Sequence, residues 1–271
     1  PGRVNAVAGM GYVFISNSPK ARLLRPVVRT LLRLALGGRG ARLILQNPDD
    51  VALFEQARLV NPQDIRLIPG SGVDCERFSP GGSRSAAGPI RVLLPARLLW
   101  DKGLAEYAQA ARQLRAEGRD IEFLLAGEPD PGNPASVPEA TVREWVSEGV
   151  LKWLGKVEDM PSLYREVDVV ALPSYREGLP KGLIEAAASG CALVTTDVPG
   201  CREVVAQEVD GLLVRVRDSS ALAAAIRLLA SDRELCLRLG EAGRAKALAR
   251  FDERIVVART IGVYEELFDA V

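Results

Sequence analysis

From residue 90 onward, short apolar runs alternate with segments of helical periodicity. The apolar runs are IRVLLPA (90–96), IEFLLAG (121–127), VLKWLG (150–155), DVVALPS (168–174), ALVTTDV (192–198) and GLLVRV (211–216). Continuously apolar runs are typical of strands buried on both faces, and their alternation with helices indicates βαβ units in a parallel sheet. The pattern predicts a doubly wound α/β domain. Its ligand loops should follow the carboxyl ends of strands, after Pro95, Ala126, Leu154 and Pro173.

The region upstream of residue 80 repeats this pattern in a shorter form. Two apolar runs, 41–46 and 64–70, flank a helical stretch at 49–59. These elements are too few for a whole domain, and the chain begins abruptly at Pro1, so we expect a fragment whose N-terminal domain is incomplete. The Gly-, Ser- and Pro-rich segment 80–89 predicts a linker between two domains.

The elements together predict three parts of the chain. Residues 1–82 form a partial N-terminal Rossmann-like domain, and residues 83–250 form a second Rossmann-like domain. Two C-terminal helices are expected over 220–248 and 252–268. The last part, 251–271, is expected to pack back onto the N-terminal domain.

Composition and charge narrow the class of protein. Lys plus Arg and Asp plus Glu are both 35, so no basic excess favours a nucleic-acid partner. No apolar run reaches the roughly 18 residues that a membrane-spanning helix needs, and the start lacks a signal-peptide pattern. The four cysteines are scattered without a CxxC pair, which fits free thiols in a reducing cytoplasm. The chain has no histidine, so the commonest general base and zinc ligand are excluded.

The stretch EGLPKGLIE (177–185) has the chemistry of an anion site. A strand that ends at Pro173 is followed by a loop, and a helix is predicted to begin near Lys181. The N-terminus of a helix carries partial positive charge and suits a diphosphate, while Gly178 permits a close backbone approach. Glu185, one turn into the helix, could accept hydrogen bonds from ribose hydroxyls. The alternative is that Glu177 and Glu185 are solvated residues of a helix start, where acidic residues are common.

Glu177 and Glu185, with seven residues between them, resemble the E-x7-E motif of family 4 retaining glycosyltransferases. The resemblance extends to TTDVPGCREVV (195–205) and NAVAGMGYVF (5–14). It implies the GT-B fold, which has two facing Rossmann-like domains. It also implies that Glu177 contacts the hydroxyls of a donor sugar and Glu185 the ribose. By the same resemblance Gly178, Leu179, Pro180 and Lys181 lie along the phosphates and the sugar.

Two cations, Arg97 and Lys102, follow the first strand of the second domain. In the family, the matching Arg and Lys grip the donor diphosphate, where they would stabilise the charge of the leaving group without a metal or other cofactor. The alternative is that both are ordinary surface charges. In the family, the loops after the next two strands hold the nucleobase through backbone groups, and here the candidates are Lys156 and Val157. Trp153 falls inside an apolar strand and is expected in the core.

Residues 20–36 predict an amphipathic helix. One face carries arginine side chains: Arg22, Arg25, Arg29 and Arg33. The opposite face carries aliphatic side chains: Leu24, Val27, Leu31 and Leu34. Such a helix could rest on an anionic membrane. The alternative is a helix packed on its own sheet with a solvated arginine face, and Pro26 could start or kink it.

The resemblance implies a metal-independent retaining transferase with the donor diphosphate as base. A diphosphate base fits a chain without histidine. By analogy, the enzyme would move a hexose or N-acetylhexosamine from a nucleotide diphosphate sugar, UDP-linked in the family, to a lipid-linked saccharide at the inner face of the membrane. The alternatives are a catalytically silent nucleotide-sugar-binding or scaffold protein and another GT-B enzyme, such as a sugar-phosphate synthase or phosphorylase. A nicotinamide-dependent oxidoreductase is disfavoured, because PARLLWDKG (95–103) lacks the G-x-G-x-x-G pattern.

Overall fold

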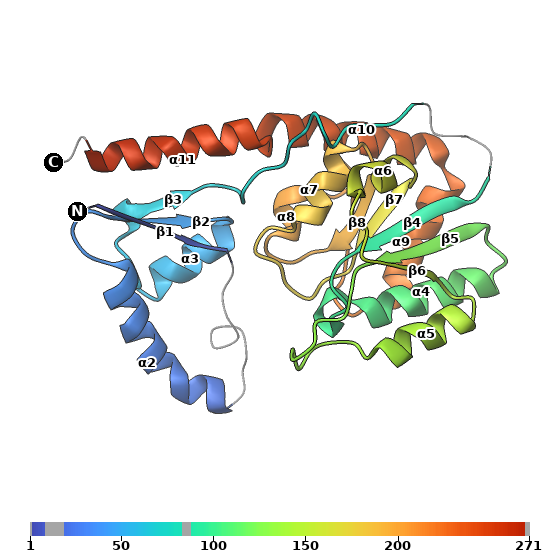
Figure 1. Ribbon diagram of the computed structural model, residues 1–271, viewed down its shortest axis with the longest axis horizontal. Helices are drawn as coiled ribbons and strands as arrows, with labels where there is room; N and C mark the ends of the chain where they lie inside the picture. The colour runs from blue at the N-terminus through green and yellow to red at the C-terminus, as the bar shows by residue number, and fades with distance from the viewer. Residues whose placement is uncertain (1, 9–18, 83–87, 269–271) are drawn as a thin grey trace. The chain divides into compact units, whose positions relative to one another are not determined.

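A computed structural model describes residues 2–8, 19–82 and 88–268 of the chain (Figure 1). The chain divides into two compact units. The first contains Pro1–Gly72 with Arg250–Val271, and the second contains Val73–Ala249. Within the described residues, no helix is both long enough and apolar enough to cross a bilayer.

The second unit is built on a six-stranded parallel sheet. Its strands are β4 (Ile90–Pro95), β5 (Ile121–Ala126), β6 (Lys152–Gly155), β7 (Val169–Leu172), β8 (Ala192–Thr196) and β9 (Leu212–Val214). Their order in the sheet is β6-β5-β4-β7-β8-β9. The direction of strand addition therefore reverses between β4 and β7, which confirms the predicted doubly wound topology.

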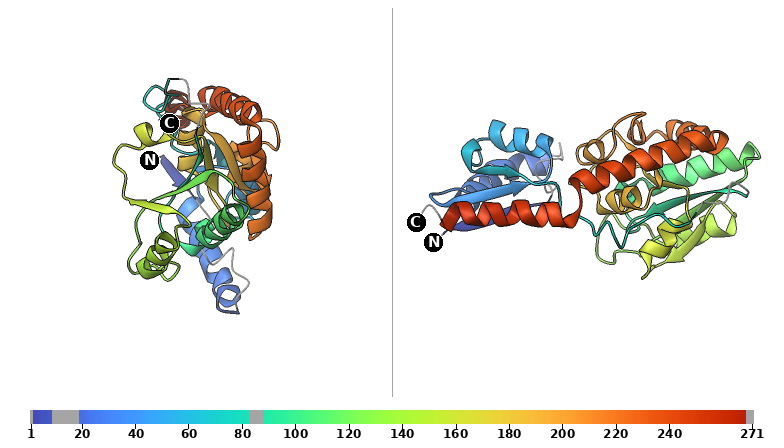
Figure 2. Two further views of the ribbon diagram at one scale, coloured as in Figure 1. Left: turned by 90° about the vertical axis from the view of Figure 1, so that its right-hand side faces the viewer. Right: turned by 90° about the horizontal axis from the view of Figure 1, so that it is seen from above.

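Helices cover both faces of this sheet (Figure 2). They are η2 (Trp100–Lys102), α4 (Leu104–Ala116), α5 (Glu139–Ser147), α6 (Met160–Arg165), α7 (Lys181–Ala188), α8 (Cys201–Val204), α9 (Ser219–Ser231) and α10 (Arg233–Arg250). Every residue of β7 and β8 is buried, as their continuously apolar runs predict. The single helix predicted over 220–248 is wrong. Asp232 ends α9, and its carboxylate accepts a hydrogen bond from Leu235 N at the start of α10.

The first unit has a three-stranded parallel sheet in the order β1-β2-β3. Its elements are β1 (Arg3–Val7), α2 (Pro19–Leu36), β2 (Ala41–Leu45), α3 (Pro48–Gln56), η1 (Pro62–Asp64), β3 (Ile65–Leu67) and α11 (Glu253–Phe268). Leu43 and Leu45 of β2 pack with α2 and α3, whereas Ile44, which points to the opposite face, packs with α11. The C-terminal helix therefore completes the first unit.

Residues 73–82, which the sequence assigned to the N-terminal domain, belong to the second unit. Phe78 is buried there, with its ring centroid 6.0 Å from that of Tyr164. Arg165 donates hydrogen bonds to the carbonyls of Arg77 and Ser79. The difference arises because this segment has no periodicity, so its contacts could not be read from its own residues. Most of the predicted linker, 83–87, lies outside the described residues.

Candidate functional site

The predicted phosphate residues lie on two loops that follow neighbouring strands. Residues 96–103 follow β4 and residues 173–180 follow β7, and these two strands pair in parallel. Parallel strands end at the same edge of a sheet, and ligands of open α/β sheets bind where the strand order reverses. The fold thus brings Arg97, Lys102 and the segment 177–185 to the edge where a ligand is expected.

The two loops are packed closely together at their backbones. Gly103 has φ of 76°, and a Cβ added there would lie 2.2 Å from Pro173 O. Gly200, which lies between β8 and α8, has φ of 80°, and a Cβ added there would lie 2.5 Å from Gly178 O. Only glycine tolerates both the left-handed backbone and these approaches. Tyr175 N also donates to Asp101 O at 2.8 Å, so the loop after β7 is held from both sides.

Lys102 and Glu177 form an ion pair between the two loops. The distance from Lys102 Nζ to Glu177 Oε1 is 2.6 Å, and Ser174 Oγ donates to the same oxygen at 2.7 Å. The two charged side chains are 19% and 12% exposed, respectively. The pair is therefore largely screened from water, and Glu177 is not the solvated helix-start residue of the alternative interpretation.

Tyr175 anchors the same loop to α4. Its hydroxyl donates to Glu106 Oε1 at 2.8 Å, and the guanidinium carbon of Arg217 lies 4.6 Å from its ring centroid. Burial, and then the hydrogen bond to Glu106, raises the pKa of Tyr175. The other carboxylate oxygen of Glu106 is buried and has no hydrogen-bond partner among the described residues. The cluster gives the loop a fixed geometry beside the Lys102–Glu177 pair.

Helix α7 begins at Lys181, as the sequence predicts, and no side chain of the described residues caps it. Its partial positive charge is therefore presented at the carboxyl end of β7. Glu185 lies one turn further along, and its side chain is 16% exposed. Tyr164 OH lies 3.3 Å from Glu185 Oε2, and Lys181 Nζ lies 4.0 Å from Glu185 Oε1. Burial raises the pKa of Glu185, an effect that Lys181 and Tyr164 oppose.

Arg97 does not share a partner with Lys102. Its Nη1 pairs at 2.6 Å with Oδ2 of Asp130, in the loop after β5, and 65% of its side chain is exposed. Lys102 thus belongs to a largely buried ion pair, whereas Arg97 belongs to an exposed one.

The candidates for the nucleobase lie after β6. Lys156 is exposed and pairs with Glu158, which raises the pKa of Lys156, and Val157 beside it is half-buried. Trp153 is half-buried rather than fully in the core. Its indole N–H donates to Gly127 O at 2.8 Å, so it ties the loop after β5 to β6. Gly178, Leu179 and Pro180 lie between Glu177 and α7, where the two leading residues are half-buried and Pro180 is buried.

Several side chains that organise this site were not predicted from the sequence: Ser174, Tyr164, Asp130, Tyr175 and Glu106. Ser174 had a usable signal, because it is the first hydroxyl after a buried strand. Tyr164 had none, since a tyrosine within an apolar helical segment reads as a core residue.

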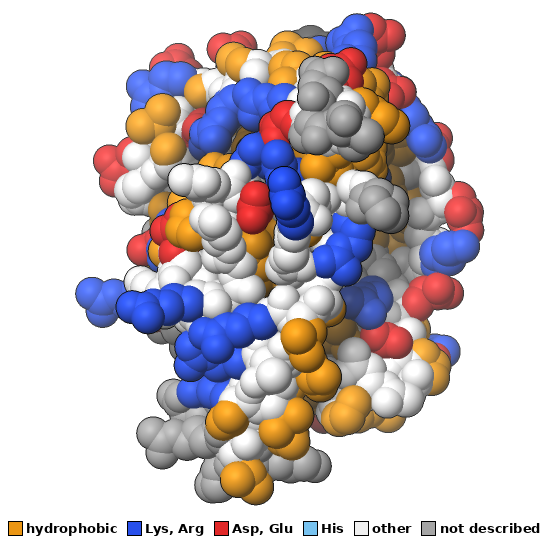
Figure 3. Space-filling model, turned by 90° about the vertical axis from the view of Figure 1, so that its left-hand side faces the viewer, with side chains coloured by type: hydrophobic (Ala, Val, Ile, Leu, Met, Phe, Trp, Pro, Cys, Tyr) orange, Lys and Arg blue, Asp and Glu red, His pale blue; other side chains and the backbone are white. Residues whose placement is uncertain are grey.

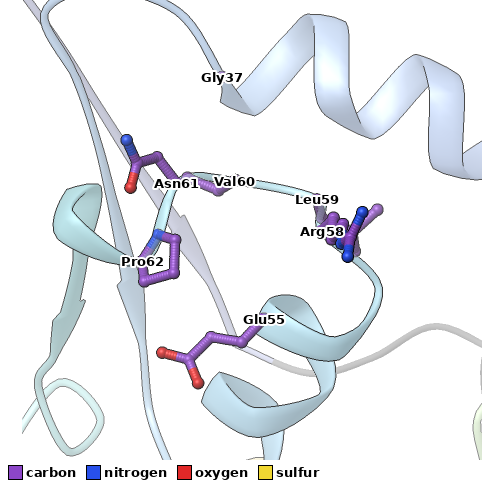
Figure 4. Close-up of a pocket in the computed structure, with 7 residues that line it drawn as sticks. All are labelled: Gly37, Glu55, Arg58, Leu59, Val60, Asn61 and Pro62. Atoms are coloured by element: carbon purple, nitrogen blue, oxygen red, sulfur yellow. The ribbon is translucent and has the colours of Figure 1, made fainter.

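A surface pocket of about 500 Å³ lies in the first unit, near the C-terminal end of α3 (Figure 4). It is lined by Gly37, Glu55, Arg58, Leu59, Val60, Asn61 and Pro62. None of the predicted site residues contributes to it. Across the described parts of the chain, no cluster of three or more Cys, Asp or Glu side chains could hold a metal ion.

Helix α2 exposes its aliphatic face to solvent. The alternative interpretation, a helix packed on its own sheet, expected the arginine face to be solvated instead. Arg29 Nη2 donates to Ala57 O at 2.7 Å, and Arg33 Nε donates to Arg58 O at 2.7 Å. The exposed side chains on the other face are aliphatic: Leu23, Leu24, Val27, Leu31 and Leu34. Figure 3 shows hydrophobic side chains at the bottom of the view, where α2 lies, with Lys and Arg side chains above them. The helix continues through Pro26, and the side chains of Lys20 and Arg22 lie outside the described part.

Comparisons with known proteins agree on a family. The family model "Glycosyl transferases group 1" matches residues 89–232, more than half of the 271 residues. The N,N'-diacetylbacillosaminyl-diphospho-undecaprenol alpha-1,3-N-acetylgalactosaminyltransferase of Campylobacter jejuni is 29% identical over 98% of this chain and 71% of its own length. The MMP alpha-(1->4)-mannosyltransferase of Mycolicibacterium hassiacum is 32% identical over 76% of this chain. The chain spans about half the length of that relative, 49%.

Solved structures of two other proteins align with nearly the whole of this chain. Sucrose-phosphate synthase from Thermosynechococcus elongatus has a TM-score of 0.81 at 26% identity, over 99% of this chain and 68% of that one. Anabaena HepE, in complex with UDP and glucose, has a TM-score of 0.79 at 23% identity, over 96% of this chain and 71% of that one. The resemblance seen in residues 5–14 falls partly outside the described residues, but that in 177–205 lies within the matched family region. With its parallel α/β units and its GT-B neighbours, the chain belongs to the group 1 glycosyl transferases.

Proposed function

We propose that this chain binds a nucleotide diphosphate sugar and transfers its hexose or N-acetylhexosamine, with retained configuration, to a lipid-linked saccharide. The observation that carries the proposal is the Lys102–Glu177 pair beside the uncapped start of α7, at the point where the strand order reverses. A cation and a helix N-terminus suit a diphosphate, and a carboxylate between them suits sugar hydroxyls. The name of the Campylobacter relative supports the lipid-linked acceptor, and the UDP in the HepE structure supports a UDP-linked donor.

Each site residue has a distinct task in this proposal. The backbone of 178–181 and the side chains of Arg97, Lys102 and Lys181 bind the diphosphate, while Lys156 and Val157 flank the base. Glu177 accepts hydrogen bonds from the sugar and Glu185 from the ribose. The bond between the anomeric carbon and the diphosphate oxygen breaks, the acceptor oxygen bonds to that carbon on the same face, and the acceptor proton passes to the diphosphate. The cations stabilise the leaving group, so the proposed reaction needs no metal.

We also propose that α2 contacts the membrane that holds the lipid-linked acceptor, at its cytoplasmic face. Burial of exposed leucine and valine side chains in the acyl boundary is favourable by roughly 1.5–3 kcal/mol for each fully buried side chain. Because Arg29 and Arg33 bond to backbone carbonyls of their own unit, the contact should depend on the aliphatic face. Leu31→Glu should abolish sedimentation with vesicles of anionic phospholipid, whereas Leu228→Glu, at an exposed leucine of α9, should not. Equal sedimentation of both variants would contradict the contact.

A second candidate function is transfer to a soluble sugar phosphate, which the similarity to sucrose-phosphate synthase favours. It uses the same donor site and differs only in the acceptor. A catalytically silent nucleotide-sugar-binding protein is the third outcome of the test.

The test begins with calorimetric titration of the chain with UDP-, GDP- and ADP-sugars. We expect a UDP-sugar to bind best, and Glu185→Ala and Arg97→Ala each to weaken it by about tenfold. Failure of every nucleotide sugar to bind would contradict the donor site. Transfer is then assayed with polyprenyl-diphosphate-linked saccharides and with sugar phosphates as acceptors. Binding without transfer to either acceptor, by a chain whose N-terminal domain is restored to full length, would support the silent alternative.

A further inference from the structure

Each of the two glutamates of the E-x7-E motif accepts a hydrogen bond from the hydroxyl of a fully buried residue. Ser174 bonds to Glu177, and Tyr164 bonds to Glu185. We propose that Ser174 and Tyr164 are positioning residues, which determine the carboxylate oxygen that each glutamate presents to the donor. The inference rests on the proposed function, because it assigns new residues to the same site.

Ser174 fixes the orientation of Glu177 by donating a second hydrogen bond to one carboxylate oxygen. Its Oγ and Lys102 Nζ both bond to Glu177 Oε1, at 2.7 and 2.6 Å. The backbone of Ser174 is itself fixed, because its carbonyl accepts a hydrogen bond from the buried Thr196 hydroxyl. Among the described residues, Glu177 Oε2 has no hydrogen-bond donor. An ammonium alone can exchange between the two oxygens of a carboxylate, whereas a second donor whose position is fixed, Ser174 Oγ, keeps Oε1 occupied and leaves Oε2 for the sugar.

Tyr164 acts in the same way on Glu185. Its single hydroxyl hydrogen is shared between two acceptors of α7, Glu185 Oε2 at 3.3 Å and Gly182 O at 3.2 Å. Complete burial and the neighbouring ring of Phe78 restrain the side chain of Tyr164, and a hydrogen bond from Cys191 Sγ to its carbonyl, at 3.3 Å, restrains its backbone. Glu185 Oε1 is left toward Lys181, on the exposed side of the helix.

The environment of Glu185 makes this hydroxyl more important. Burial raises the pKa of Glu185, and the hydrogen bond from Tyr164 lowers it again, so the hydroxyl favours the ionised form. An ionised carboxylate accepts hydrogen bonds with both oxygens, whereas a protonated one must donate through one of them. Tyr164 therefore supports both the orientation and the charge that a pair of ribose hydroxyls requires.

Tyr164→Phe tests the ribose side, because it removes one oxygen and keeps the buried ring. Dissociation constants are measured for UDP and for 2′,3′-dideoxy-UDP, with Tyr264→Phe, at an exposed tyrosine of α11, as control. We expect the natural sequence to prefer UDP, and Tyr164→Phe to reduce that preference about five- to tenfold while dideoxy-UDP binds as before. An equal loss for both ligands indicates a merely structural role and would overturn the proposal, as would no change.

Ser174→Ala tests the sugar side, with Ser147→Ala, at an exposed serine of α5, as control. We expect the dissociation constant of UDP to change less than twofold. The ratio by which the best-binding UDP-sugar binds more tightly than UDP should fall about fivefold or more. Equal weakening of UDP and UDP-sugar would overturn this role.

The two levels of the proposal fail differently. If the natural sequence binds neither UDP nor a UDP-sugar, the proposed function and the positioning roles both fail. If it binds and distinguishes these ligands but the hydroxyl variants distinguish them equally well, only the positioning roles fail.

Discussion

The two predicted phosphate cations sit in contrasting surroundings, although both follow the same strand. Lys102 pairs with Glu177 at 2.6 Å, and the two side chains are only 19% and 12% exposed. Arg97 pairs with Asp130 at the same distance, but its side chain is 65% exposed. Removing one partner of a desolvated pair leaves an uncompensated charge, whereas exposed pairs contribute little. We infer that Lys102 is held within the fold of the site, whereas the exposed Arg97 is the cation that can exchange Asp130 for a ligand.

The largest effect is expected from Lys102→Ala. Glu177 then loses its charge partner, so the free energy of unfolding should fall by about 1–3 kcal/mol, and transfer should fall by about 10²- to 10³-fold. Urea unfolding and initial rates measure the two losses. In the double variant Lys102→Ala/Glu177→Ala, stability should recover and transfer should not. An unchanged urea midpoint for the single variant would show that the two side chains are not coupled.

Arg97→Ala should separate binding from stability. We expect unfolding to change by less than about 1 kcal/mol, because the pair is exposed, and affinity for UDP to fall about tenfold. The control is Arg112→Ala, which removes a partly exposed arginine paired with Glu148 away from the site. A loss of stability as large as that of Lys102→Ala would remove the contrast between the two pairs.

Glu185→Gln adds a third carboxylate to the comparison, one that is mostly buried with its cation 4.0 Å away. Because burial raises the pKa of Glu185, its ionisation opposes folding. The protonated carboxyl of Glu185 therefore favours the folded state. This contribution to stability is complete below the pKa that Glu185 has in the unfolded chain, and it is lost as pH rises through the higher pKa of the folded protein. The Gln variant should therefore be more stable than the natural sequence at neutral pH, with the difference disappearing in acid. Urea unfolding between pH 4 and 8 measures this.

A control of opposite sign is available in Glu117, whose pKa is lowered by its hydrogen bond from Arg227. Glu117→Gln should reduce stability at neutral pH, and this difference should also disappear in acid. Binding of UDP supplies the functional counterpart. In the natural sequence it should strengthen as pH rises through the pKa of Glu185, and the Gln variant should lack that step.

The smallest effect is expected from Asp130→Asn. It keeps the side-chain shape and releases Arg97, so stability should change by less than about 0.5 kcal/mol and UDP should bind slightly more tightly, about twofold. Calorimetry at low salt is the sensitive measurement. Weaker binding would indicate that Asp130 aims Arg97 at the ligand instead of competing for it.

Much of the second unit could be predicted because its signals are local. The apolar runs became β4 to β9, and α7 begins at Lys181 after the loop that was predicted to bind an anion. The errors fall where a signal is weak or long-range. Asp232 divides a helix through an ordinary N-cap bond, and residues 73–82 join the second unit through the buried Phe78.

The amino-acid sequence by itself determined the strands, the loops that follow them and the E-x7-E spacing, since periodicity and helix starts depend on residues a few positions apart. Tertiary structure alone decided that β4 lies beside β7, so that Lys102 meets Glu177, and that Arg97 meets Asp130 instead. It also decided that α2 exposes its aliphatic face, and that Tyr164 lies under Glu185. The reason is range: a hydrogen bond requires atoms within about 3 Å, and residues far apart in the chain reach that distance only after the sheet has ordered its strands.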